Sequence, residues 1–128
     1  MPHLILYAHE PDLATKEAAL IAALTDAIVE VYGEWARADA VVQLVGLAPG
    51  RWGIGGAPAK NPAPRVTFGI RDGVFARPDG PEILAALARN VTDAIASVLG
   101  EKHRAGTTIE FVGAPDGRTA VAGALVSP

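Results

Sequence analysis

The second half of this 128-residue chain repeats the plan of the first half. A shift of 67 positions aligns residues 19–58 with residues 86–125 without a gap, and 17 of the 40 aligned positions are identical. Upstream, residues 2–6 correspond to residues 64–68 at a spacing of 62, so the second copy carries five additional residues before its helix. Two copies of about sixty residues are too few for a solenoid, so we interpret the chain as a duplicated module.

Each copy has the pattern of a strand, a helix and a second strand. Short runs rich in β-branched and aromatic residues predict the strands, and apolar residues at helical spacing predict helices that end at Gly33 and Gly100. The expected elements are strands at 3–8, 41–45, 66–70 and 109–112 and helices at 20–31 and 83–98. A helix between two strands of one sheet implies a parallel crossover. The expected fold is therefore an α/β (α+β) fold in which two tandem βαβ units form a four-stranded sheet with two helices on one face.

A proline-rich segment separates the two copies. Three prolines lie within residues 57–64, which is typical of an extended linker. We expect a first βαβ unit over 1–58, a linker over 59–63 and a second, degenerate unit over 64–128.

The composition bears on partners and compartment. Half of the residues are apolar, and a single layer of two helices leaves one face of the sheet bare, so we expect a symmetric oligomer. A net charge of −3 argues against nucleic acid or an anionic membrane as a partner. The chain shows no signal sequence and no long uninterrupted apolar segment, which favours a cytoplasmic protein. There is no cysteine to act as a nucleophile, and the three histidines lack metal-ligand spacing, so we expect no metal site.

Pro2 is the first candidate for a catalytic group. If Met1 is removed after synthesis, Pro2 presents a secondary amine that takes up and releases protons near neutral pH. An α-amino group titrates at roughly 7.7 to 8.0, burial lowers that pKa further, and a general base works best near the operating pH. The alternative is that proline is simply a common second residue in cytoplasmic proteins.

Two features of the first unit resemble the small tautomerases of the 4-oxalocrotonate tautomerase type. These features are the Met1-Pro2 start and the segment Gly50-Arg51-Trp52-Gly53-Ile54-Gly55-Gly56, and the helix residues Leu20-Ile21 and Thr25-Asp26-Ala27 agree with them. The resemblance implies a tautomerase/MIF-like fold built from βαβ units, used as short chains in hexamers or as fused pairs in trimers. It also implies catalysis by the amino-terminal proline without a cofactor, and a homotrimer for a fused chain such as this one.

The chemistry implied by the resemblance requires cations beside the proline. Keto–enol tautomerisation of a 2-oxo acid needs a base and a group that binds the carboxylate, and the planar fork of arginine suits the second task. In the family an arginine follows the first strand, but residues 9–12 are acidic in this chain, whereas Arg71 and Arg77 follow the first strand of the second unit. This arrangement resembles the fused chloroacrylate dehalogenases, whose second half supplies two arginines. We therefore expect Pro2 as the base, Arg71 and Arg77 as ligands of a small carboxylate substrate, and Trp52 as an aromatic wall.

Several alternatives stay open at this point. Arg71 and Arg77 could be solvated turn residues, and Trp52 could be an ordinary core or interface residue. A third arginine of the family, on the closing strand, is replaced by Val41 and Thr108, which argues against a dicarboxylate substrate.

Other reactions of the same superfamily give further alternatives. A malonate semialdehyde decarboxylase-like enzyme would have an aspartate just after the first helix, and Asp39 is displaced by one residue from that position. A hydratase would need a carboxylate near the end of the second unit, and residues 119–125 contain none. A chain that retains Met1 would instead be a noncatalytic trimeric scaffold or binding protein.

Overall fold

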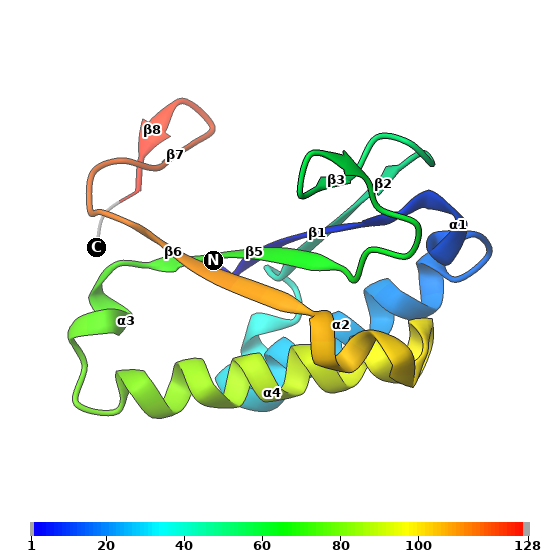
Figure 1. Ribbon diagram of the computed structural model, residues 1–128. Helices are drawn as coiled ribbons and strands as arrows, with labels where there is room; N and C mark the ends of the chain where they lie inside the picture. Colours follow the sequence, from blue (N-terminus) through cyan, green and yellow to red (C-terminus); the bar gives the residue numbers. More distant parts are fainter. Residues whose placement is uncertain (1, 127–128) are drawn as a thin grey trace.

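One four-stranded sheet and two long helices form the body of the chain in the computed structural model, which describes residues 2–126 (Figure 1). The sheet strands are β1 (His3–His9), β2 (Val41–Leu47), β5 (Arg65–Arg71) and β6 (Thr108–Ala114), and the long helices are α2 (Glu17–Tyr32) and α4 (Gly80–Leu99). The order across the sheet is β2-β1-β5-β6. β1 is parallel to β2 and β5 is parallel to β6, and the two units meet where β1 and β5 pair antiparallel. The expected pair of βαβ units in one four-stranded sheet is confirmed.

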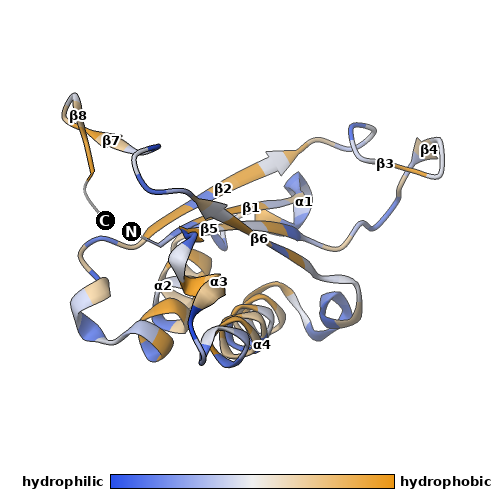
Figure 2. Cartoon of the chain, turned by 90° about the vertical axis from the view of Figure 1, so that its left-hand side faces the viewer, coloured by the Kyte–Doolittle hydropathy of each residue, from blue (hydrophilic) through white to orange (hydrophobic). Residues whose placement is uncertain are grey.

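The core lies between the sheet and the helices. In the central strands β1 and β5, every second residue faces the helices and is buried, and one stripe along each helix covers these residues. The edge strands β2 and β6 alternate between exposed and partly buried residues. The fully buried core residues include Leu4, Leu6, Val66 and Phe68 from the strands and Leu20, Leu24, Ile28, Leu87, Val91 and Ile95 from the helices. Figure 2 shows the sheet as a single layer with α2 and α4 on one side, so the other face is uncovered in one chain.

Short elements complete each unit. They are the helices α1 (Glu10–Leu13) and α3 (Gly73–Ala76), the 3-10 helices η1 (Glu34–Ala36) and η2 (Glu101–Gly106), and the hairpin strands β3 (Gly53–Ile54), β4 (Ala57–Pro58), β7 (Ala120–Val121) and β8 (Ala124–Leu125). The sequence pattern did not predict the short helices, because four residues are too few to display a hydrophobic period. The two hairpins lie at opposite ends of the sheet, on the side away from the helices (Figure 1).

The additional residues of the second copy lie mainly in a helix. The strand-to-helix connections cover residues 10–16 and 72–79 and differ by one residue, whereas α2 has 16 residues and α4 has 20. The expectation that the extra residues expand the loop is therefore wrong, since most of them add one turn to the start of α4. Pro81 lies in that first turn, where a missing N–H breaks no hydrogen bond.

Glycines end both long helices, as the sequence predicts. Gly33 has a φ of 103° and its N–H donates to the carbonyl of Val29, and Gly100 has a φ of 123° and donates to Ala96. Positive φ values of this kind favour glycine, which has no Cβ. The chain therefore leaves each helix at a fixed residue and enters a 3-10 turn.

Matched contacts at the two ends of the sheet show that the units are built alike. The N–H of Val41 donates to the carbonyl of Pro2 with an N–O distance of 3.0 Å, and the N–H of Thr108 donates to the carbonyl of Pro64 at 3.2 Å. The ion pairs between each long helix and the 3-10 helix that follows it also repeat. Arg37 pairs with Glu34 and Asp26, and Arg104 pairs with Glu101 and Asp93. The start of β1 and the start of β5 are therefore equivalent positions at opposite ends of the sheet.

Candidate active site

A cavity of about 770 Å³ lies where β1 begins and β5 ends. Because β1 and β5 are antiparallel, with His3 opposite Gly69, the first residues of one strand lie beside the last residues of the other. Pro2 is buried and lines the cavity from the first unit, and Arg71 is exposed and lines it from the second unit. The structure therefore brings together two residues that the sequence predicted to work in one site.

Arg71 has a guanidinium that is free to meet a ligand. It is the last residue of β5, on the same face of the strand as Gly69, and that face points away from the helices. Across residues 2–126, no ion pair engages Arg71. An unpaired guanidinium beside a cavity fits the predicted role in binding a carboxylate.

Arg77 is engaged elsewhere. Its Nε and Nη2 donate to the two carboxylate oxygens of Asp79 at 2.8 and 2.9 Å, and its side chain is 58% exposed. This hydrogen-bonded pair lowers the pKa of Asp79 and raises that of Arg77. Arg77 does not line the cavity in the described part of the chain, so its predicted contact with a substrate carboxylate stays a prediction.

Trp52 lies at the other end of the sheet. β2 runs parallel to β1, so the hairpin that follows β2 is located far from the residue that begins β1. Trp52 lines a different cavity, together with Pro64. The repeat places Thr119 in the equivalent position of the Pro2 cavity, and Thr119 does line that cavity. Within one chain, Trp52 and Pro2 therefore do not share a cavity.

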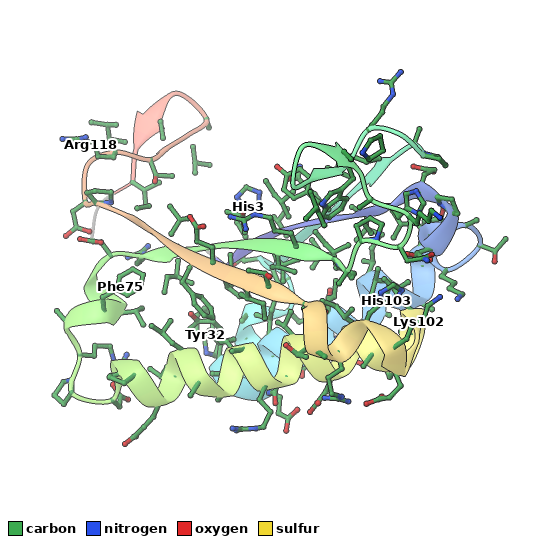
Figure 3. All side chains as sticks on the ribbon, in the orientation of Figure 1. His3, Tyr32, Phe75, Lys102, His103 and Arg118 are labelled. Carbon is green, nitrogen blue, oxygen red and sulfur yellow. The ribbon has the colours of Figure 1, made fainter. Side chains whose placement is uncertain are left out.

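Two aromatic residues that the sequence analysis did not select line the Pro2 cavity. They are Tyr32, the last residue of α2, and Trp35 in η1, whose rings form an edge-to-face pair with centroids 6.4 Å apart. Burial raises the pKa of Tyr32, and the positive charge of Arg77 opposes that shift in part. Figure 3 shows Tyr32 projecting between α4 and the sheet, on the side of the molecule where α3 lies. The βαβ topology was the signal that could have predicted these two residues. The helix α2 runs antiparallel to β1, so its last residues lie beside the first residues of β1.

Two carboxylates also line the Pro2 cavity. Asp39 lies two residues before Val41, whose N–H holds the Pro2 carbonyl, and Asp116 lies in the turn after β6. The decarboxylase alternative predicts a role for Asp39, whereas the hydratase alternative considers residues 119–125 and so misses Asp116. Arg71 is the one lysine or arginine among the described residues that line this cavity. That charge inventory suits one carboxylate of a substrate better than two.

The described residues give two further results. Residues 2–126 contain no group of three His, Cys, Asp or Glu side chains placed to hold a metal ion. In the same range, no helix has the length and apolar character needed to cross a membrane.

Comparisons with known proteins agree with this architecture. Residues 2–61 match the family model described as Tautomerase enzyme. A wild-type fused 4-oxalocrotonate tautomerase (fused 4-OT) that forms an asymmetric trimer is similar in structure, with a TM-score of 0.81 and 23% identity over 96% of this chain and 94% of that chain. A member of the cis-3-chloroacrylic acid dehalogenase family gives a TM-score of 0.72 with 19% identity over 98% of this chain and 83% of the other. No curated protein matches the sequence.

The family model covers residues 2–61, which is the first of the two units, and the whole chain is similar in fold to the fused 4-OT proteins. The macrophage migration inhibitory factor of Toxoplasma gondii has the same fold, with a TM-score of 0.72 and 11% identity over 97% of this chain and 99% of that chain. In this chain, as in the fold of the similar fused 4-OT proteins, two βαβ units of one polypeptide form the four-stranded sheet.

Proposed function

We propose that this chain is a cofactor-independent tautomerase that moves a proton between oxygen and carbon in a small enolised 2-oxo acid. Pro2, unblocked by removal of Met1, is the general base, and Arg71 binds the substrate carboxylate. Met1 itself lies outside the described residues. The observation that carries the proposal is the shared cavity, since buried Pro2 from one unit and unpaired Arg71 from the other both line it.

The proposed reaction needs no co-reactant. The neutral amine of Pro2 takes the proton from the enol hydroxyl, the carbonyl forms at C2, and the resulting cationic amine returns the proton to C3. Arg71 holds the carboxylate, which keeps C3 near the amine and stabilises the developing enolate. Tyr32 is a candidate hydrogen-bond donor to the enolate oxygen, because it lines the same cavity and its phenol is protonated at neutral pH.

Asp39 favours a second candidate, a decarboxylase of the same superfamily. A carboxylate near the Pro2 amine stabilises the cationic form of that amine. Cationic Pro2 would donate a hydrogen bond to the carbonyl of a 3-oxo acid while the bond to the carboxylate carbon breaks. The electron pair then enters the enolate, carbon dioxide leaves, and the amine supplies the proton that completes the product.

The dependence of kcat/KM on pH separates the two candidates. A tautomerase needs the neutral amine, so its rate rises as the pH rises through the pKa of Pro2, whereas a decarboxylase needs the cation and loses rate over the same range. Mass spectrometry of cell-derived protein would first establish whether Met1 is absent. A chain that retains Met1 is the matched blocked control, because its Pro2 nitrogen is an amide. Equal rates for the blocked and unblocked chains would contradict both candidates and favour the scaffold alternative.

A homotrimer is the proposed assembly. Apolar side chains on the uncovered face of the sheet stay accessible in one chain, with Val41 40% exposed, Val45 39% and Val112 44%. Burial of such a face against other copies is stabilising, and the similar fused 4-OT proteins are described as trimers. Light scattering on the purified protein tests this assembly, and a monomeric mass would contradict it.

A further inference from the structure

A second cavity, of about 670 Å³, lies at the opposite end of the sheet, where β5 begins. Pro64 lines it as Pro2 lines the first cavity, and the N–H of Thr108 donates to the Pro64 carbonyl as the N–H of Val41 donates to that of Pro2. The hairpins repeat the correspondence, because Ala59 donates to the carbonyl of Trp52 as Val126 donates to that of Thr119. The chain therefore has two equivalent cavities, of which the proposed function uses one.

The second cavity has lost the base. Pro64 lies inside the chain, so its nitrogen is a tertiary amide that neither accepts nor donates a proton at neutral pH. Whatever binds there is not turned over by proline chemistry.

The charged and aromatic residues differ between the two cavities. The repeat aligns Trp35 with Lys102, Asp39 with Gly106 and Thr119 with Trp52. The second cavity therefore has a tryptophan from its hairpin and two cations, Arg65 and Lys102, and no carboxylate lines it among the residues described. Arg65 pairs with Glu110 at 2.9 Å, while Lys102 is exposed and makes no ion pair within residues 2–126.

His103 adds a buried polar group to the same wall. Its side chain is 4% exposed, and its Nε2 has no hydrogen-bond partner in the described part of the chain. The nearest charged group is a carboxylate oxygen of Asp12, at 3.4 Å from Nε2. Figure 3 shows Lys102 and His103 together at this end of the molecule, far from Tyr32 and Phe75.

We propose that the second cavity is a noncatalytic binding site for a small carboxylate that carries a planar apolar group. The carboxylate binds the Lys102 ammonium, and the planar group packs against the indole of Trp52. A carboxylate is favoured here because Lys102 makes no ion pair within residues 2–126 and no described carboxylate lines this cavity, whereas Asp39 and Asp116 line the Pro2 cavity together with its single arginine.

The two tryptophans of the chain allow each cavity to be observed separately. Trp35 lines the first cavity and Trp52 the second, so Trp35→Phe leaves a single tryptophan that reports on the proposed site. We expect phenylacetate to change the Trp52 fluorescence of this variant in a saturable way. Phenylacetate has no 2-oxo group, so it is not a substrate of the proposed reaction. Lys102→Gln in the same background should weaken binding on the order of tenfold, the usual effect of losing one charge-assisted contact. Lys16→Gln is the matched control, since Lys16 is exposed and lines neither cavity.

The outcome does not depend on activity at Pro2. The blocked chain that retains Met1 should bind phenylacetate at the second cavity as the unblocked chain does, and neutral phenylacetamide should bind at least tenfold more weakly. Calorimetry on the native chain is the independent measurement, and Lys102→Gln should weaken one binding event per chain by about tenfold. The proposal is overturned if phenylacetate leaves Trp52 fluorescence unchanged up to about 10 mM, a range that covers even weak binding. It is also overturned if Lys102→Gln and Lys16→Gln bind equally well.

Discussion

Replacement of Arg71 by alanine should cost the proposed enzyme most of its rate while leaving the fold unchanged. Arg71 is exposed at the end of β5 and makes no ion pair with any described residue, so its removal leaves no partner unpaired in the free protein. Hydrogen bonds to charged groups contribute about 1.5–3 kcal/mol. Because 1.36 kcal/mol corresponds to a factor of ten, kcat/KM should fall by about 10- to 100-fold.

The assay is ketonisation of an enolised 2-oxo acid, followed by the loss of enol absorbance. Arg71→Lys keeps the charge and loses the planar fork, so it should lie between the native chain and Arg71→Ala. Arg89→Ala is the matched control, because Arg89 is an exposed residue of α4 that lines neither cavity. Arg77→Ala should have a smaller effect than Arg71→Ala, since the fork of Arg77 is already bound to Asp79.

Two results would refute this reasoning. If Arg71→Ala retains kcat/KM within about twofold of the native value, the guanidinium does not bind the substrate. If Arg77→Ala is the more damaging variant and Arg71→Ala is nearly silent, the carboxylate binds nearer α4, and the pair with Asp79 opens on binding.

Two further predictions concern pH and the helix ends. Tyr32 has a raised pKa in the folded chain, so its contribution to stability is present below pH about 10, the usual value for tyrosine, and declines as the pH rises through the folded pKa. Urea unfolding of the native chain and of Tyr32→Phe, at pH 8 and at increasing alkaline pH, measures this contribution to the free energy of unfolding. The prediction is contradicted if the native chain gains stability relative to Tyr32→Phe as the pH rises. Gly33→Ala and Gly100→Ala should each lower stability by about 1–3 kcal/mol, because both glycines have a positive φ. Only Gly33→Ala should also alter the Pro2 cavity, since the added Cβ would lie 3.1 Å from a ring carbon of Trp35, and equal activity losses in the two variants would argue against this.

The sequence predicted the fold well because the repeat limits it. Two copies of a strand, helix and strand pattern leave few ways to form a sheet, and Gly33 and Gly100 end the helices where the pattern indicated. Gly46 and Gly113 occupy matched positions in the closing strands, and the reason why glycine is required there cannot be read from the pattern of one strand. A Cβ at Gly46 would overlap the carboxylate of Glu10, and a Cβ at Gly113 would overlap that of Asp72. Both are contacts between a strand and the short helical turn beside it.

The composition of the cavity was harder to predict, because it depends on which ends of antiparallel strands meet. Chemistry predicted Pro2 as a base and Arg71 as a carboxylate ligand in complementary halves, and the structure brings both residues to one cavity, while their roles stay predictions. Trp52 was selected by its place in a motif, and the direction of β2 locates that motif at the other end of the sheet. Tyr32 and Trp35 have no motif of their own, and only the return of α2 across the sheet brings them to Pro2.

Fusion of the two units accounts for the unequal cavities through a single peptide bond. In an assembly of identical short chains, both ends of every sheet would begin with a free proline, and any substitution would alter both cavities together. Because Pro64 is joined to the preceding residue, its nitrogen is an amide, and the cavity that it lines is not constrained by the proton transfer proposed for Pro2. Substitutions such as Lys102 in place of a tryptophan and Gly106 in place of an aspartate then change one cavity without changing the other. The charge difference between the two ends is therefore the expected physical consequence of duplication. It gives the chain the proposed base at one end and, at the other, a cation that makes no ion pair with any described residue.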